Sequence, residues 1–141
     1  MANMVEMKGK YVRSSSKNYE EFLDALGVGF ILKKAATVTT PEMTVEETNG
    51  EWTIKMSTIL KTFKLKFKIG EEFDDKTPDG REVTSLVKLD GNKLIATQMA
   101  KKAGEKSTRS TREFFDDKCI LTLEILGTDI VSTQTFTRKT E

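Results

Sequence analysis

Residues 18–36, NYEEFLDALGVGFILKKAA, decide the fold because they break the pattern of the rest of the chain with a helical repeat of apolar side chains. The apolar side chains are Tyr19, Phe22, Leu23 and Leu26 in the first half, and Val28, Ile31, Leu32 and Ala35 in the second. Asn18 is suited to cap the first helix with Glu21 as its capping-box partner, and Gly27 is suited to end it. Pro41 excludes further helix, so we expect two short helices joined by a turn.

Beyond residue 40 the chain consists of short runs in which apolar and polar residues alternate. Residues 62–69, TFKLKFKI, are typical, because the apolar side chains point to one face of a strand and the lysines to the other. Turn sequences separate the runs, at Asn49-Gly50, Pro78-Asp79-Gly80, Asp90-Gly91-Asn92 and Gly127. About eight strands with such spacing are typical of an antiparallel sandwich or barrel. We expect one domain over residues 1–141, with the helical segment, about 18–36, inserted after the first strand.

Composition argues against several classes of protein. The 141 residues carry 23 basic and 22 acidic side chains, and a net charge of +1 argues against nucleic-acid binding. No apolar run reaches the roughly eighteen residues that a membrane-spanning helix needs. The first ten residues, MANMVEMKGK, lack the apolar core of a secretory signal. Cys119 is the single cysteine, so no intramolecular disulfide forms and we expect a cytoplasmic protein.

Histidine is absent from the sequence, which removes the commonest general base and the Ser-His and Cys-His nucleophile pairs. Zinc sites built on histidine are excluded as well, and one cysteine cannot replace them. We therefore expect neither an enzyme nor a bound metal or cofactor.

Polar side chains on the inward faces of two strands point to a binding function. Two helices are too few to cover so many strands, so the sheet is expected to close on itself. Within residues 107–115, STRSTREFF, strand alternation places Arg112 on the face of Phe114 and Arg109 on the opposite, outward face. The inward faces then include Thr108, Ser110 and Arg112 on one strand, and Ser132, Gln134 and Phe136 on another. Inward polar groups are costly unless water or a ligand satisfies them, so a wet cavity that holds a ligand is predicted.

Three segments carry a resemblance to a known family. They are GKYVRSSSKNYEEFLDALGVGF (9–30), FKIGEEFDDKTPDGREVTSLVKLDGNKLIATQ (67–98) and STREFFDDKCILTLE (110–124). Together they resemble the intracellular lipid-binding proteins, which comprise the fatty-acid-binding proteins and their cellular retinoid-binding relatives. The resemblance implies a ten-stranded, flattened antiparallel β-barrel with a helix-turn-helix lid. It also implies a carrier, not an enzyme, that holds one long-chain lipid, and we expect it to be a monomer.

The resemblance assigns a head-group site. In that family an arginine on the eighth strand and an Arg-x-Tyr pair on the last strand hold a carboxylate. The first position matches Arg112, whereas the pair falls on Gln134 and Phe136, as in the retinol-binding branch. A long-chain fatty acid or related acyl lipid is thus the implied ligand, and a retinoid or neutral lipid is the alternative. The alternative for Arg112 is a structural role, paired with an internal glutamate or with water.

Other positions are candidates for contact with the ligand. By resemblance, Leu60 matches a bulky side chain that gates access, and Gln98 matches a polar position that lines the cavity. From the lid, Tyr19, Phe22 and Leu23 are candidates too, although their helical spacing is equally typical of plain core packing.

Lysines gather near the expected lid. Lys33 and Lys34 are placed at the end of the second helix, where positive charge suits the helix C-terminus. The alternative is a basic surface that also includes Lys61, Lys64 and Lys66. Such a surface would contact anionic membranes, or would be recognised by a nuclear import partner or nuclear receptor. Cytoplasmic action is therefore expected, with delivery to the nucleus as the alternative.

Overall fold

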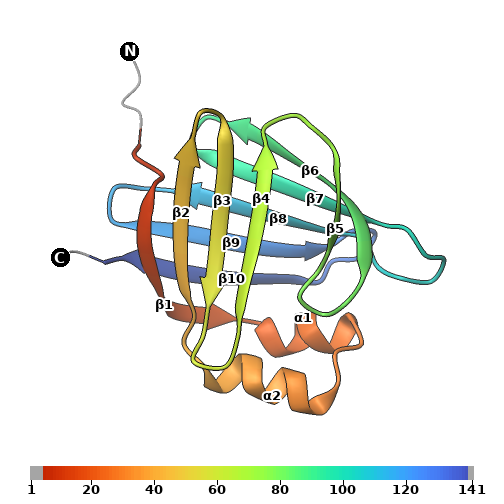
Figure 1. The fold of residues 1–141 in the computed structure, drawn as a ribbon. Helices are drawn as coiled ribbons and strands as arrows, with labels where there is room; N and C mark the ends of the chain where they lie inside the picture. The colour runs from red at the N-terminus through yellow and green to blue at the C-terminus, as the bar shows by residue number, and fades with distance from the viewer. Residues whose placement is uncertain (1–4, 140–141) are drawn as a thin grey trace.

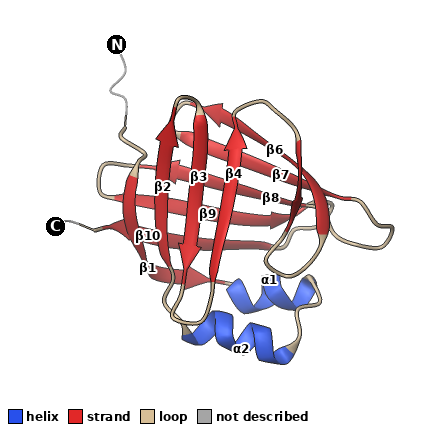
Figure 2. Ribbon diagram, in the orientation of Figure 1, coloured by secondary structure: helices blue, strands red, loops and turns tan. Residues whose placement is uncertain are grey.

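The computed structural model describes residues 5–139, which form a nearly closed antiparallel barrel with two helices at one end (Figure 1, Figure 2). The elements in chain order are β1 (Gly9–Lys17), α1 (Tyr19–Ala25), α2 (Phe30–Val38), β2 (Glu42–Thr48), β3 (Glu51–Ser57), β4 (Thr62–Lys68), β5 (Phe73–Lys76), β6 (Glu82–Asp90), β7 (Lys93–Ala100), β8 (Thr108–Phe114), β9 (Lys118–Ile125) and β10 (Val131–Arg138). The ten-stranded barrel with its lid after the first strand is confirmed. Residues 1–4 and 140–141 of the predicted domain lie outside the described residues.

Strand pairing explains why the barrel is nearly closed. The sheet has the order β4-β3-β2-β1-β10-β9-β8-β7-β6-β5, so β4 and β5 are its two edges. β1 links the two halves, because its first residues pair with β2 and its later residues with β10. The β1–β10 register shifts between Arg13 and Ser15, which is the mark of a bulge, and bulges bend a strand. Neither α1 nor α2 could span a bilayer, and the described part of the chain has no other helix.

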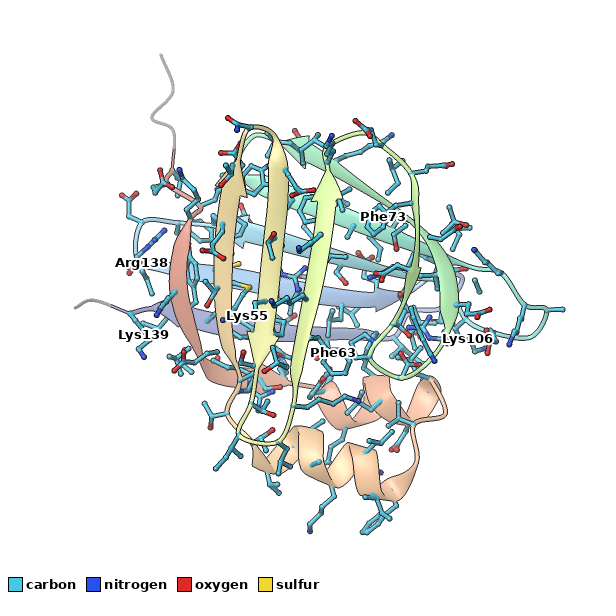
Figure 3. All side chains as sticks on the ribbon, in the orientation of Figure 1. Lys55, Phe63, Phe73, Lys106, Arg138 and Lys139 are labelled. Carbon is cyan, nitrogen blue, oxygen red and sulfur yellow. The ribbon has the colours of Figure 1, made fainter. Side chains whose placement is uncertain are left out.

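The main apolar core ties the two ends of the described chain together. Tyr11, Phe114 and Phe136 are fully buried, and the rings of Tyr11 and Phe114 meet edge to face with centroids 5.8 Å apart. The Tyr11 hydroxyl donates a hydrogen bond to the carbonyl oxygen of Met7 at 2.8 Å. The guanidinium of Arg138 lies 4.7 Å from the centre of the Tyr11 ring, and Figure 3 shows Arg138 close to the C-terminal end. Burial of aromatic rings of this size stabilises a fold by about 1.5–3 kcal/mol each.

The helices differ from the sequence-based expectation in two details, the capping of α1 and the end of α2. Asn18 adopts a left-handed conformation with φ 60° and its side chain makes no capping hydrogen bond, so the predicted capping box is wrong. The helix begins there because the amide of Phe22 donates to the carbonyl oxygen of Asn18 at 3.1 Å. Gly27 has φ 80° and ends α1, as predicted. α2 continues to Val38, beyond the predicted end, and the Thr39 hydroxyl bonds the carbonyl of Ala35 near that end.

Candidate ligand-binding site

Strand β8 points alternate side chains into the barrel, and Arg112 is one of them. Thr108, Ser110, Arg112 and Phe114 are buried, whereas the three residues between them are only partly buried. Arg112 is 8% exposed. Arg109 points outward, where it forms an ion pair with Glu124 of β9, with N–O distances of 3.0 and 3.1 Å. The alternation predicted from the sequence is therefore found.

Arg112 and Gln134 lie in one row of inward-facing residues that are opposite one another on neighbouring strands, and we call such a row a rung. Arg112 lies opposite Leu94 of β7 on one side and Leu121 of β9 on the other, and Leu121 lies opposite Gln134 of β10. Gln134 is 3% exposed. On the next rung Phe114, Cys119 and Phe136 follow one another and are fully buried. A polar pair thus borders a wall of apolar side chains.

Arg112 has no counter-charge among the residues that the structure describes. Its Nε atom is buried and has no hydrogen-bond partner among the described residues. Within residues 5–139 no carboxylate forms an ion pair with it, so the predicted alternative of an internal glutamate is not found. Burial lowers the pKa of Arg112 below its usual value, but an arginine stays protonated at any working pH. Burial also raises the pKa of the Cys119 thiol to about 12, so this neighbour is neutral and supplies no anion.

A second polar rung lies two rungs from Arg112. Ser85 of β6, Gln98 of β7 and Thr108 of β8 lie opposite one another across three neighbouring strands. The Thr108 hydroxyl donates to the side-chain oxygen of Gln98 at 2.9 Å. The Ser85 hydroxyl is buried and has no partner among the residues that the structure describes. Gln98 was expected here, whereas Ser85 and the second rung were missed by sequence reasoning.

Ser85 could have been found from the alternation of its own strand. In β6 the inward positions are Val83, Ser85 and Val87, and all three are buried. A serine between two valines on the face that points inward is a polar interruption of an apolar stripe. The same signal had drawn attention to Arg112.

Arg81 is another buried cation, but it has its own partners. Its guanidinium bonds the carboxylate of Asp79 at 2.8 and 3.2 Å, and it also bonds the carbonyl oxygen of Lys106. Burial opposes ionisation of Asp79, but hydrogen bonds from Arg81 and Thr77 outweigh it and hold the Asp79 pKa below its usual value. This ion pair lies in the β5–β6 turn. Of the two buried arginines in the described residues, Arg81 therefore has a carboxylate partner and Arg112 has none.

The three lid candidates form a small cluster of their own. Phe22 and Leu23 are 5% and 7% exposed and pack with Ile125 of β9. Tyr19 stacks on Phe22 with ring centroids 6.5 Å apart, and Arg13 lies 5.7 Å from the centre of the Tyr19 ring. These contacts attach α1 to the sheet as core packing does, and contact of the three side chains with a ligand stays a prediction.

The exposed side chains around the helices are apolar and basic, and we call Phe30, Ile31, Lys34, Leu60 and Lys61 the portal surface. α2 has no buried residue, and Phe30 and Ile31 are 74% and 81% exposed. Leu60, in the β3–β4 turn at the same end of the barrel, is 67% exposed (Figure 1). The Lys61 ammonium lies 4.6 Å from the ring centre of Phe63, which Figure 3 shows at the lid end of β4.

The prediction for Lys33 and Lys34 needs two corrections. Both lie in the middle of α2 and not at its end, because the helix continues to Val38. Lys33 forms an ion pair with Asp24 of α1 at 2.7 Å, which links the two helices. Lys34 is exposed, so of the two it is the one that can face a partner.

The barrel, its lid and the buried cation define a small β-barrel binding protein, and comparison with known proteins agrees. The Lipocalin / cytosolic fatty-acid binding protein family matches residues 8–140. A muscle fatty acid-binding protein of Schistocerca gregaria is 38% identical over 129 residues, 90% of this chain and 92% of the relative. Cellular retinoic acid-binding protein 2 of Mus musculus is 36% identical over 139 residues, 96% of this chain and 100% of the relative. The solved structure of a Schistosoma mansoni fatty acid binding protein in complex with arachidonic acid has a TM-score of 0.87 and 28% identity, and the match covers 99% of this chain and 100% of that one.

The chain therefore belongs to the lipocalin / cytosolic fatty-acid binding protein family. The resemblance seen in the sequence is confirmed. This is a family of lipid-binding carriers.

Proposed function

We propose that this protein is an intracellular carrier of one long-chain fatty acid, with the carboxylate at Arg112 and the hydrocarbon chain inside the barrel. The observation that carries the proposal is the buried guanidinium of Arg112, whose Nε has no hydrogen-bond partner and which forms no ion pair among residues 5–139. An isolated charge is expensive to bury, and a carboxylate is the ligand group that best matches the fork of an arginine. The relatives named for fatty acids support the same ligand class.

The hydrocarbon chain supplies most of the affinity in this proposal, and Arg112 selects and orients the head group. Burial of sixteen methylene groups at about 0.8 kcal/mol each is worth roughly 13 kcal/mol before the costs of ordering and association. Gln134 can add an amide donor to the carboxylate, but Phe136 cannot donate a hydrogen bond. The head-group clamp is therefore weaker than one with two arginines and a tyrosine.

The proposal is tested by mass spectrometry of lipid extracted from the purified protein, followed by displacement titrations of wild type and Arg112→Gln. We expect fatty acids in the extract. We also expect carboxylate binding to weaken more than tenfold in the variant, which corresponds to about 1.4 kcal/mol. Equal binding of a fatty acid by the two proteins would remove Arg112 from the site.

A retinoid or a neutral lipid is the second candidate, and Gln134 with Phe136 favours it. Both residues are buried on β10, and by the family resemblance they stand where a second arginine and a tyrosine would complete a carboxylate clamp. A relative named for retinoic acid supports the retinoid class, but retinoic acid is itself a carboxylate and gives no support to a neutral ligand. Retinol or neutral lipid in the extract, with affinity unchanged or higher in Arg112→Gln, would select this candidate.

The portal surface suits transient contact with anionic membranes, from which a carrier collects its lipid or to which it delivers it. Exposed apolar side chains beside lysines are the pattern of surfaces that dock at a lipid interface. We propose that the protein acts in the cytoplasm as a single-domain monomer without catalytic activity. Delivery to a nuclear import partner or receptor stays a prediction from the lysines.

A further inference from the structure

We propose that the rung of Ser85, Gln98 and Thr108 is a second polar subsite, which binds a hydroxyl group in the middle of the acyl chain. The inference rests on the proposed function and narrows its ligand to hydroxylated long-chain fatty acids. Ser85 and Thr108 are 2% and 4% exposed, so the subsite belongs to the interior of the barrel.

The hydrogen bonds of the rung leave groups for a ligand oxygen. The bond from Thr108 occupies the side-chain oxygen of Gln98 and leaves the amide NH2 of Gln98 as a donor. The Ser85 hydroxyl has no partner among the described residues, and it can both donate and accept. A ligand hydroxyl also donates and accepts, so it can bond Ser85 and Gln98 at the same time. A methylene group at this place would leave the Ser85 hydroxyl buried and unpaired.

The position of the rung suits the middle of a bound chain. Thr108 and Arg112 lie on the same face of β8, four residues apart, which is ~13 Å along a strand. An extended chain of carbon–carbon bonds covers that length in about ten bonds. Ile125 follows Thr108 on the same rung and contacts Phe22 and Leu23 of the lid. The subsite therefore lies between the cation and the lid, on the path of a chain that extends from Arg112 towards α1.

The neighbours of Ser85 are apolar, which makes its hydroxyl selective. On β6 Ser85 has Val83 and Val87 as its inward neighbours, and on β5 it lies opposite Phe73. A hydroxyl placed against these side chains would lose its hydrogen bonds to water and meet only hydrocarbon. On the path towards Arg112 the next inward residue of β8, Ser110, is also polar and buried, and the positional series separates the two places. The subsite therefore discriminates between positions of the hydroxyl group as well as between its presence and absence.

The experiment compares stearic acid with a positional series of mid-chain hydroxystearic acids, in displacement titrations on wild type, Ser85→Ala and Ser132→Ala. Ser132 is the matched control, because it is also fully buried but its hydroxyl already bonds the carbonyl oxygen of Lys17 at 2.9 Å. We expect wild type and Ser132→Ala to bind one member of the series about fivefold more tightly than stearic acid, the size of one hydrogen bond. Ser85→Ala is expected to lose this preference and to keep its affinity for stearic acid.

The outcomes separate this inference from the proposed function. If stearic and all hydroxystearic acids bind wild type equally, the rung holds water only and the inference is overturned, while the carrier function stands. A preference that persists unchanged in Ser85→Ala would overturn it as well. If wild type binds none of these acids, the proposed function fails, and the inference fails with it.

Discussion

Arg112 of β8 and Gln134 of β10 lie on one rung of the barrel, two strands apart, with Leu121 between them. Adjacent strands are about 4.8 Å apart, so the backbones of the two residues are separated by roughly 10 Å. Both side chains are buried, and only one of them carries a charge. A single anionic group between them could bond both side chains, and this relationship gives the site its asymmetric head-group clamp.

Arg112→Met is expected to stabilise the ligand-free protein while it weakens the binding of fatty acids. Replacement of an unpaired buried cation by a flexible apolar side chain removes a desolvation penalty, and we expect a gain of about 1–3 kcal/mol in the free energy of unfolding. Urea unfolding of delipidated protein measures the gain, and displacement titration measures the loss of affinity. A variant less stable than wild type would mean that Arg112 makes stabilising contacts in the free protein.

Gln134→Arg is expected to strengthen the binding of fatty acids and to destabilise the ligand-free protein, the opposite of the effects of Arg112→Met. A second cation on the rung strengthens carboxylate binding by about fivefold or more, because charged hydrogen bonds are stronger than neutral ones. It also lowers the stability of the ligand-free protein by about 1–3 kcal/mol, because two buried like charges repel. Thr133→Arg is the matched control, since the neighbouring Thr133 is exposed on the outer face. A fatty-acid affinity that stays the same in Gln134→Arg would contradict this geometry.

Asp79→Asn is expected to show how the contribution of the Asp79–Arg81 ion pair to the free energy of unfolding depends on pH. The pKa of Asp79 is lowered in the folded protein from an ordinary value of 3.8. A carboxylate with a lowered pKa stabilises the fold above the ordinary value, and this contribution is lost as pH falls through the folded pKa. Wild type should therefore exceed Asp79→Asn by about 1–2 kcal/mol at neutral pH, and the difference should shrink below about pH 4. Urea unfolding at pH 7 and at pH 3 tests this, and a constant difference would refute it.

The portal surface yields a prediction for lipid transfer. Lys34→Gln combined with Lys61→Gln is expected to slow transfer of a fluorescent fatty acid to anionic vesicles several-fold, and high salt should remove the difference. Lys33→Gln is the matched control, because the ion pair with Asp24 already engages Lys33. Equal rates for the double variant and wild type would show that the exposed apolar residues, not the lysines, mediate membrane contact.

Local patterns in the sequence indicated about eight strands in an antiparallel sandwich or barrel, whereas the ten strands of the barrel were predicted from the family resemblance. The alternation in residues 107–115 placed Arg112 inside and Arg109 outside, and Gly27 marked the end of α1. The start of the first helix at Asn18 was predicted, but the capping box was not found, because Asn18 adopts a left-handed backbone conformation and its side chain makes no capping hydrogen bond. The second helix was longer than predicted, although the threonines near its end favour strands by propensity.

The sequence by itself determined which side chains face the interior, because strand alternation is a property of the local backbone. Only the tertiary structure decided which of those side chains meet. Arg112 and Gln134 are brought to one rung by the register of three strands, and the same is true of Ser85, Gln98 and Thr108. Register depends on contacts between residues that are distant in the sequence, so no local pattern contains it. Arg112 was therefore recognisable in the sequence, whereas its lack of a protein counter-charge and the second polar rung became visible only in the folded barrel.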